Sequence, residues 1–294
     1  MHQANILLQK ALKVGGNPYA LSKLTTFTVT QIKNTFNYLI VKYDFALFPL
    51  VISENLGLRK AVLICKDTKI NMENRKNLFF PLVNVFRHDI EKNEFILTLY
   101  VNKTSLNEVS SAIEKLNAKG YVNCKLILVK NVFRFTRDPL CFDFEKGKWI
   151  CEDKIVIINK YFKVNPDADD INLITSIQRN PYLNYIRNIH WRHIKSVINA
   201  FIYTLGRSNF ILDVFSKEDI SDKFPNTIWT LKTDEMFISE IYCYDELEKI
   251  IEKVKKYSSD FLIVPKTPGY AEGYSIPYEI FKKKTWEFPK IVIE

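Results

Sequence analysis

The sequence predicts an α+β chain of tandem winged helix-turn-helix and ferredoxin-like α/β sandwich units, internally duplicated. The tripeptide NPY at residues 17–19 recurs at 180–182, and an amphipathic helical stretch follows both copies. The strand-like run 93–101 resembles 234–242, and the helical segments after these runs share one apolar spacing. Two kinds of element that recur in the same order indicate that one unit occurs twice.

The first half opens with a pattern of three helices. Gly15 and Gly16 end the first helix, and Thr28 can cap the third. Pro49 in the run that follows suits a wing better than a central strand. The expected helices are 5–14, 18–24 and 28–42, and the expected wing is 45–52.

A sandwich pattern follows in each half, in the order strand, strand, strand, helix, strand. This order is one helix short of a ferredoxin-like βαββαβ fold, and the segment 67–78 can supply that helix in the first half. Gly120 stands where a helix end is expected. The expected strands are 61–65, 82–87, 95–101 and 125–129 with a helix at 106–119, then 210–215, 227–231, 236–242 and 261–264 with a helix at 245–257.

These elements divide the chain into consecutive domains. Turn-forming and acidic residues at 165–170 mark a boundary and a helix start. We expect a strand pair around Gly147 and an ordered surface loop at 265–277. The expected domains are 1–57 (winged helix-turn-helix), 58–134 (sandwich), 135–169 (linker), 170–209 (second winged helix-turn-helix) and 210–294 (second sandwich with a C-terminal loop and tail).

The composition is that of a folded globular protein, with 47% hydrophobic and 26% charged residues. Eight glycines are few for a glycine-rich nucleotide-binding fold. The sequence also lacks a P-loop, a nucleophile elbow, an HExxH motif and a kinase signature. We therefore expect no enzymatic activity, no catalytic residues and no cofactor.

The formal net charge of +9 favours a polyanionic partner, because Lys and Arg side chains release counterions when they neutralise phosphates. In the third helix an apolar stripe packs inward, so polar side chains at the start of the helix face outward, where base edges would be read. In the second half, Trp191, Ile194, Ile198, Phe201 and Leu205 form the equivalent buried stripe of a second recognition helix. The alternative is a solvated polar face on a structural domain. The expected DNA-contacting residues are Thr28, Thr30, Gln31, Lys33, Asn34, Arg187, Arg192, His193, Lys195, Ser196 and Asn199.

The cysteines and histidines do not form a recognised metal motif. Cys65, Cys124 and Cys243 lie in apolar runs and are expected to be buried free thiols. Cys141 and Cys151 flank a turn, and a disulfide between them is left open.

His190 and His193 are three residues apart, but no carboxylate or cysteine has the spacing to complete a site, so no metal is expected. We interpret His190 as a turn residue, and His193 as a phosphate or base contact or simply a surface residue. The one dense polar cluster, Arg87-His88-Asp89, is interpreted as a hairpin tip rather than a catalytic group.

The order of elements, together with the step Asn55-Leu56-Gly57-Leu58-Arg59 into a strand, resembles the leucine-responsive (Lrp/AsnC) regulators. The resemblance covers residues 5–129 and, in weaker form, 170–264. It implies paired sandwich domains, a homodimer and a small-molecule effector site in the sandwiches. The long linker, the shortened second sandwich and the absence of a glycine-containing effector signature after Val101 depart from that family.

A related enzyme group, the sirohaem decarboxylases, uses the same architecture. The run VNVFRHDIEKNEFILTLYV resembles the sheet region of these enzymes, which implies Arg87 and His88 as contacts to haem carboxylates. The main expectation is a sequence-specific or architectural protein that binds double-stranded DNA and regulates transcription. We expect it to be cytoplasmic and nucleoid-associated, without a membrane partner. The alternatives are an enzyme or tetrapyrrole-binding protein on this scaffold, and a protein-interaction module.

Overall fold

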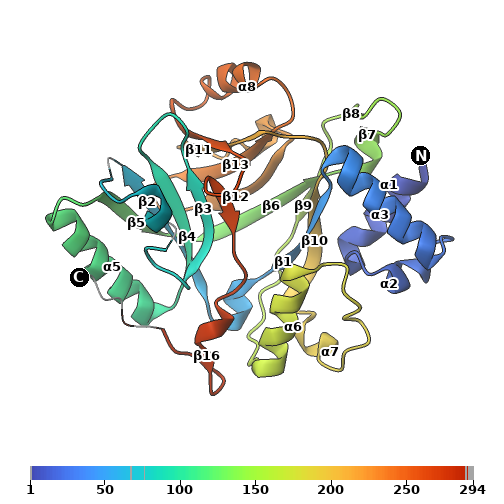
Figure 1. The fold of residues 1–294 in the computed structure, drawn as a ribbon, viewed down its shortest axis with the longest axis horizontal. Coiled ribbons are helices and arrows are strands. Elements are labelled where there is room, and N and C mark those ends of the chain that lie inside the picture. The colour runs from blue at the N-terminus through green and yellow to red at the C-terminus, as the bar shows by residue number, and fades with distance from the viewer. Residues whose placement is uncertain (1, 67, 76, 289, 291–294) are drawn as a thin grey trace. The chain divides into compact units, whose positions relative to one another are not determined.

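The computed structural model describes residues 2–66, 68–75, 77–288 and 290, and it confirms the α+β class (Figure 1). The chain forms two compact units that interleave along the sequence, so they do not coincide with the consecutive domains expected above. Unit 1 comprises Met1–Leu56, Phe133–Arg207 and Pro225–Ile228, and unit 2 comprises Gly57–Val132, Ser208–Phe224 and Trp229–Glu294.

The three helices predicted at the start of unit 1 are present. They are α1 (His2–Val14), α2 (Pro18–Ser22) and α3 (Val29–Tyr43). The Thr28 hydroxyl accepts a hydrogen bond from the Gln31 backbone N–H, and the Gln31 side chain accepts one from the Thr28 N–H. This capping box satisfies two backbone donors that the first turn of α3 would otherwise leave without partners.

The predicted second recognition helix is wrong. Only α7 (Trp191–Ile194) is helical, and the chain continues as strand β10 (Ile198–Thr204), which pairs antiparallel with β1 (Ala46–Val51). The segment INAFIYT is rich in β-branched and aromatic residues, which fit a buried strand. Its apolar spacing also fits a helix, so the distant partner β1 decides the outcome.

The predicted linker 135–169 is also structured. Strand β6 (Asn131–Arg137) pairs antiparallel with β9 (Lys154–Ile157). The predicted strand pair around Gly147 is confirmed as the hairpin of β7 (Phe142–Asp143) and β8 (Lys148–Trp149). Helix α6 (Ala168–Arg179) begins at the acidic boundary predicted from the sequence.

The two NPY motifs contact each other inside unit 1. The Asn17 side chain accepts a hydrogen bond from the Ala20 N–H at the start of α2 and donates one to the Leu183 carbonyl at 2.8 Å. The Gly16 N–H donates to the Pro181 carbonyl at 3.0 Å. A Cβ at Gly16 would stand 2.3 Å from the Tyr182 ring, so only glycine allows this approach. The repeat therefore marks two segments that pack together.

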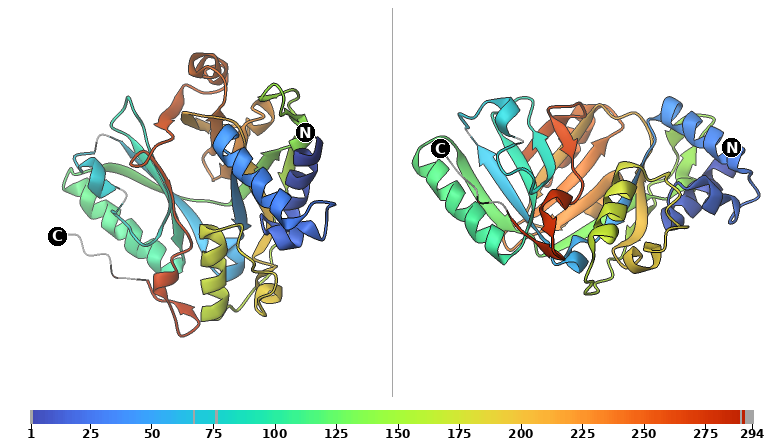
Figure 2. Two further views of the ribbon diagram at one scale, coloured as in Figure 1. Left: turned by 45° about the vertical axis from the view of Figure 1, so that its right-hand side comes forward. Right: turned by 60° about the horizontal axis from the view of Figure 1, so that its bottom comes forward.

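Unit 2 contains two sheets with the same strand order, each covered by a helix, and Figure 2 shows α5 running along the first sheet. The order β3-β4-β2-β5 in one sheet matches β12-β13-β11-β14 in the other, and this correspondence supports the predicted duplication. The elements are β2 (Arg59–Lys66), β3 (Val83–His88), β4 (Phe95–Val101), α5 (Lys103–Ala118), β5 (Asn123–Leu128), β11 (Phe210–Ser216), β12 (Thr227–Lys232), β13 (Phe237–Cys243), α8 (Leu247–Val254) and β14 (Asp260–Pro265).

Two further segments complete unit 2. The helix expected at 67–78 is reduced to α4 (Met72–Arg75), and residues 67 and 76 lie outside the described part of the chain. The loop expected at 265–277 is ordered and includes β15 (Ala271–Gly273), which pairs antiparallel with β3. A short hairpin, β16 (Phe281–Lys282) with β17 (Thr285–Trp286), follows.

Four of the five cysteines form disulfides. The prediction that Cys65 and Cys124 are free thiols is wrong, because they are register partners on β2 and β5 and are bonded to each other. Cys141 and Cys151 form the second disulfide, and Cys243 is a buried free thiol as expected. Within the described part of the chain, none of the helices combines the length and apolar character needed to cross a membrane.

The Cys65–Cys124 disulfide closes a loop of 59 residues, so we expect its removal to destabilise unit 2 by about 4 kcal/mol. The matched control, Cys141→Ala/Cys151→Ala, opens a loop of only 10 residues and should cost about 3 kcal/mol. Urea unfolding of the wild type and the two double variants measures both losses in the free energy of unfolding. A Cys65→Ala/Cys124→Ala variant that is as stable as the wild type would contradict the assignment of this disulfide.

Candidate functional site

The polar cluster predicted from the sequence lies at the end of β3 in unit 2. Arg87, His88 and Asp89 are all less than 9% exposed. Successive side chains on a strand point to opposite faces, so Arg87 and His88 have different surroundings. Arg87 faces the second sheet, where it meets β13, whereas His88 lies on the same face as Phe86 and contacts α4.

Arg87 is held by acceptors within the protein. Its Nε and Nη2 atoms donate to Glu240 Oε2 at 2.9 and 2.6 Å, and Nη1 donates to the carbonyls of Phe86 and Glu272. A guanidinium engaged in this way joins the two sheets. It does not present its donors to a ligand, so Arg87 does not fit the role of haem-carboxylate contact that the resemblance implied.

Asp213 of β11 lies directly opposite Glu240 of β13 and is fully buried. Neither of its carboxyl oxygens has a hydrogen-bond partner among the described residues. Burial raises the pKa of Asp213 well above its ordinary value, the negative charge of Glu240 raises it further, and Arg87 opposes the shift. Burial and the neighbouring negative charge thus favour the protonated form of Asp213, while Glu240 accepts the hydrogen bonds from Arg87 Nε and Nη2.

His88 is a buried imidazole with one nitrogen unpartnered. Its Nε2 contacts Nη1 of Arg75, whose Nε donates to the Ile70 carbonyl and whose Nη2 donates to Asn93 Oδ1. Burial lowers the pKa of His88, Arg75 lowers it further, and Asp89 acts in the opposite direction, so the ring is neutral. A guanidinium can only donate, so Nε2 must accept and the proton lies on Nδ1.

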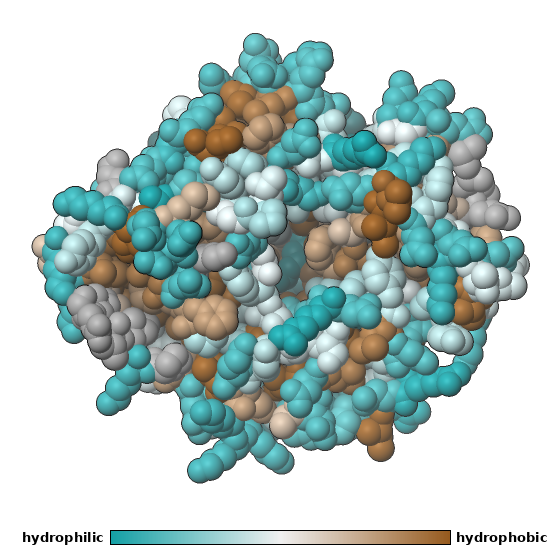
Figure 3. All heavy atoms as spheres, in the orientation of Figure 1, coloured by the Kyte–Doolittle hydropathy of each residue, from teal (hydrophilic) through white to brown (hydrophobic). Residues whose placement is uncertain are grey.

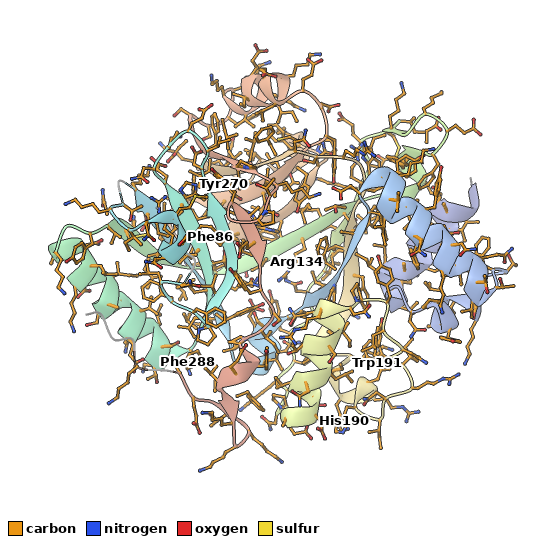
Figure 4. All side chains as sticks on the ribbon, in the orientation of Figure 1. Phe86, Arg134, His190, Trp191, Tyr270 and Phe288 are labelled. Carbon is orange, nitrogen blue, oxygen red and sulfur yellow. A yellow bond between two sulfur atoms is a disulfide. The ribbon has the colours of Figure 1, made fainter. Side chains whose placement is uncertain are left out.

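The Nδ1–H of His88 has no acceptor among the described residues. Tyr270, in the loop between β14 and β15, lies next to it. The ring centroids of His88 and Tyr270 are 5.5 Å apart, and the His88 backbone N–H donates to the Tyr270 carbonyl at 2.9 Å. Figure 4 shows Tyr270 beside β3, near Phe86. We call Arg75, His88 and Tyr270 the His88 site.

The sequence singled out His88 but not its two neighbours in this site, which come from α4 and the C-terminal loop. Asp89 plays a structural part, as the hairpin interpretation predicted. Its Oδ1 accepts the Glu91 N–H at 2.7 Å, and its Oδ2 accepts the Ile263 N–H at 2.7 Å. A buried donor without an acceptor is rare in folded proteins and is the feature of this cluster that points to a ligand.

The DNA-contacting residues that were expected in the first half of the chain all lie at the start of α3. Thr28 and Gln31 cap α3, and Thr30, Lys33 and Asn34 are exposed. Figure 3 shows both hydrophilic and hydrophobic atoms over α3, and the side chains of Ile40 and Val41 on this helix are exposed.

Arg187, expected from the second half, also lies near this helix. The guanidinium of Arg187 and the ammonium of Lys33 lie 5.8 and 5.9 Å from the Tyr19 ring centroid.

The residues expected from the second half do not share a recognition helix. Arg192 and His193 lie on the single turn α7, and Lys195 and Ser196 lie in the turn that follows it. Asn199 lies on β10, where its side-chain amide donates to the Ile158 carbonyl. Two equivalent DNA-reading helices, as expected from the sequence, are therefore not present in the described part of unit 1.

No protein-family model and no curated protein sequence matches the chain. Among solved structures, the chain is similar to the siroheme decarboxylase NirDL at a TM-score of 0.53 and 12% identity, over 96% of this chain and 95% of the other. The same enzyme in co-complex with an iron-uroporphyrin III analogue gives a TM-score of 0.52 and 12% identity, over 95% and 94% of the two chains.

These similarities contradict the expectation that the chain is not an enzyme, because both solved structures belong to a decarboxylase and match over nearly the whole chain. The expectation rested on the absence of familiar catalytic motifs.

The state of Asp213 predicts how stability depends on pH. Because its pKa is raised in the folded protein, the stabilising contribution of its proton is complete below about pH 4 and is lost as pH rises through the folded-state pKa. Asp213→Asn should remove this dependence at little cost near neutral pH. Urea unfolding at a series of pH values measures it, and identical profiles for the two proteins would contradict a protonated Asp213.

Arg87→Met should destabilise the protein by about 3–5 kcal/mol, because it leaves the Glu240 carboxylate buried without its partner. The double variant Arg87→Met/Glu240→Gln removes both charges and should recover part of that stability. Urea midpoints of the three proteins at neutral pH provide the comparison. A single variant as stable as the double variant would contradict an ion pair at this position.

Proposed function

We propose that this protein binds a carboxylate-bearing tetrapyrrole, as the siroheme decarboxylases do, and removes carboxyl groups from it. The observation that carries the proposal is the similarity to NirDL over nearly the full length of both chains. The net charge of +9 adds support, because a tetrapyrrole with several ionised carboxylates is a polyanion.

The chemistry required of the protein is limited. When a carboxyl group leaves as CO₂, the bond between the carboxyl carbon and its neighbouring carbon breaks, and the electron pair stays on that neighbour. A proton must then reach this carbon, and no oxidant is needed. His88 fits this task because its Nδ1 carries a proton with no acceptor among the described residues.

The other members of the His88 site set the state of that imidazole. Arg75 keeps the proton on Nδ1 by donating to Nε2, and its positive charge lowers the His88 pKa. Tyr270 is partly buried and places its ring beside the imidazole. We infer that Nδ1 of His88 first donates a hydrogen bond to a substrate carboxylate and then passes its proton to the carbon that loses CO₂. The Arg75 guanidinium at Nε2 offsets the negative charge left on the imidazole, and solvent returns a proton to Nδ1.

His88→Gln tests this role, because glutamine can still accept from Arg75 but cannot transfer a proton. We expect the rate of decarboxylation of siroheme to fall about 100- to 10,000-fold, while binding of iron-uroporphyrin III, followed by its visible absorption band, changes only a few-fold. Product masses, each lower by one CO₂, measure the reaction. The matched control Tyr274→Phe alters a nearby tyrosine that follows β15 and lies outside the site.

Two results would count against the proposal. The first is an absorption spectrum of iron-uroporphyrin III that the wild-type protein leaves unchanged at all protein concentrations. The second is turnover by His88→Gln at the wild-type rate. That result would contradict the role of His88 as proton donor, although the proposal of tetrapyrrole binding would stand.

DNA binding is the second candidate, favoured by the exposed cations around Tyr19 in unit 1. Lys33 of α3 and Arg187 approach the same ring, so they form one basic patch beside the start of a helix-turn-helix.

The homodimer and the small-molecule effector site that the sequence resemblance implies both stay predictions.

Removing one cation that neutralises a phosphate should reduce the slope of log affinity against log salt by about 1. We therefore expect Lys33→Ala/Arg187→Ala to reduce the slope of log affinity for duplex DNA against log salt concentration by about 2. The control is Arg192→Ala/Lys195→Ala, which removes the same charge elsewhere on unit 1 and should leave the slope unchanged. Fluorescence anisotropy measures the slope. Equal slopes for the two variants would remove the patch as a DNA-binding surface.

A further inference from the structure

Two histidines and a buried carboxylate meet in unit 1, away from the residues of the His88 site in the sequence. Asp170 lies in the first turn of α6, and His190 and His193 lie at and within α7. Asp170 Oδ1 is 3.2 Å from His190 Nδ1 and 3.7 Å from His193 Nδ1. Figure 1 shows α6 and α7 side by side, and Figure 4 shows His190 below α6. The expectation that no carboxylate could complete a site with these histidines is therefore wrong.

We propose that Asp170, His190 and His193 bind a divalent first-row transition metal ion such as Zn²⁺. One potential ligand atom from each residue lies within 4.8 Å of the others. Tetrahedral zinc, with bonds of about 2.0–2.2 Å, places its ligand atoms about 3.3–3.6 Å apart. The two Asp170 distances are close to that separation, so small side-chain rotations would bring all three atoms onto one ion.

The carboxylate of Asp170 is oriented before any metal binds. Its Oδ2 accepts the Asp167 N–H, and the Asp167 side chain accepts the Asp170 N–H in return, so a capping box holds Asp170 in place. The Asp170 side chain is only 5% exposed, and its Oδ1 faces both imidazoles. A carboxylate held by a helix cap in this way loses little conformational entropy when it becomes a ligand.

The histidines provide the other two ligands at different depths. The His190 side chain is 22% exposed and that of His193 is 64% exposed, so an ion can enter from solvent on the His193 side. Asp169 Oδ2 lies 3.7 Å from Nε2 of His190, the nitrogen turned away from Asp170. A carboxylate near the second nitrogen of a ligating histidine is a common outer partner in metal sites.

The donor set selects the class of metal. Two imidazole nitrogens and one carboxylate oxygen suit Zn²⁺, Co²⁺, Ni²⁺ or Cu²⁺, whereas Mg²⁺ and Ca²⁺ prefer oxygen donors alone. Three protein ligands leave at least one position open on the ion. A bound ion would also tie the start of α6 to the turn that leads into β10, and so would stabilise unit 1. This proposal does not depend on tetrapyrrole chemistry.

The first experiment uses the full-length protein after treatment with a chelator and dialysis. Isothermal titration with Zn²⁺ should show one site in the wild type, and Co²⁺ should give visible absorption typical of low coordination. Addition of Zn²⁺ should raise the thermal unfolding midpoint by several degrees. Asp170→Asn keeps a side-chain oxygen for the capping box, and we expect it to weaken Zn²⁺ binding more than about 100-fold.

Two further variants make the test specific. His190→Ala/His193→Ala should abolish the site, and Arg192→Ala, which changes the exposed residue between the two histidines, should bind Zn²⁺ like the wild type. The proposal fails if the wild type binds Zn²⁺ no more tightly than the double histidine variant. It also fails if binding survives in that variant but disappears in Cys141→Ala/Cys151→Ala, which would assign the ion to those cysteines and the neighbouring Asp153.

Discussion

The ion pair of Arg87 with Glu240 is the interaction on which the rest of unit 2 depends. It joins β3 of one sheet to β13 of the other in an interior where an unpaired charge would be costly. It also sets the register of β3, because a slip of one residue would turn the guanidinium toward α5 and bring Phe86 to the carboxyl groups of Asp213 and Glu240. His88 then necessarily lies on the opposite face, beside Arg75. The buried ion pair and the His88 site thus lie on opposite faces of the same strand, β3.

Much of the fold could be predicted from the sequence, because the signals for α1 to α3 and for the repeated strand–helix–strand segments are local. Capping residues and apolar periodicity depend only on neighbours within one or two turns. The failure at Ile198–Thr204 has the opposite cause. Its apolar spacing is compatible with a helix, and its pairing with Ala46–Val51 depends on a strand from the other end of unit 1. Local patterns carry no information about such a partner.

The candidate site was predictable only in part, for the same reason. His88 could be singled out because it stands in a dense polar cluster, but Arg75 and Tyr270 come from segments on either side that no spacing rule connects to it. Cys65 and Cys124 were missed as a pair because only the register of β2 against β5 places them opposite each other. In each case the missing information was which distant segments are neighbours in the fold, a property of the whole chain.

The contact between the two NPY segments has a consequence for the order of events during synthesis. Asn17 donates a hydrogen bond to a carbonyl 166 residues further along the chain. Strand β1 pairs with β10, which is also synthesised late. While the ribosome produces the intervening chain, the N-terminal helices lack the segments at 181–204 on which they pack, and contacts between such distant segments form slowly. Unit 1 can therefore complete its packing only after most strands of the first sheet of unit 2 have left the ribosome. A truncated nascent chain would expose apolar surface at its N-terminal end and would be a natural target for chaperones.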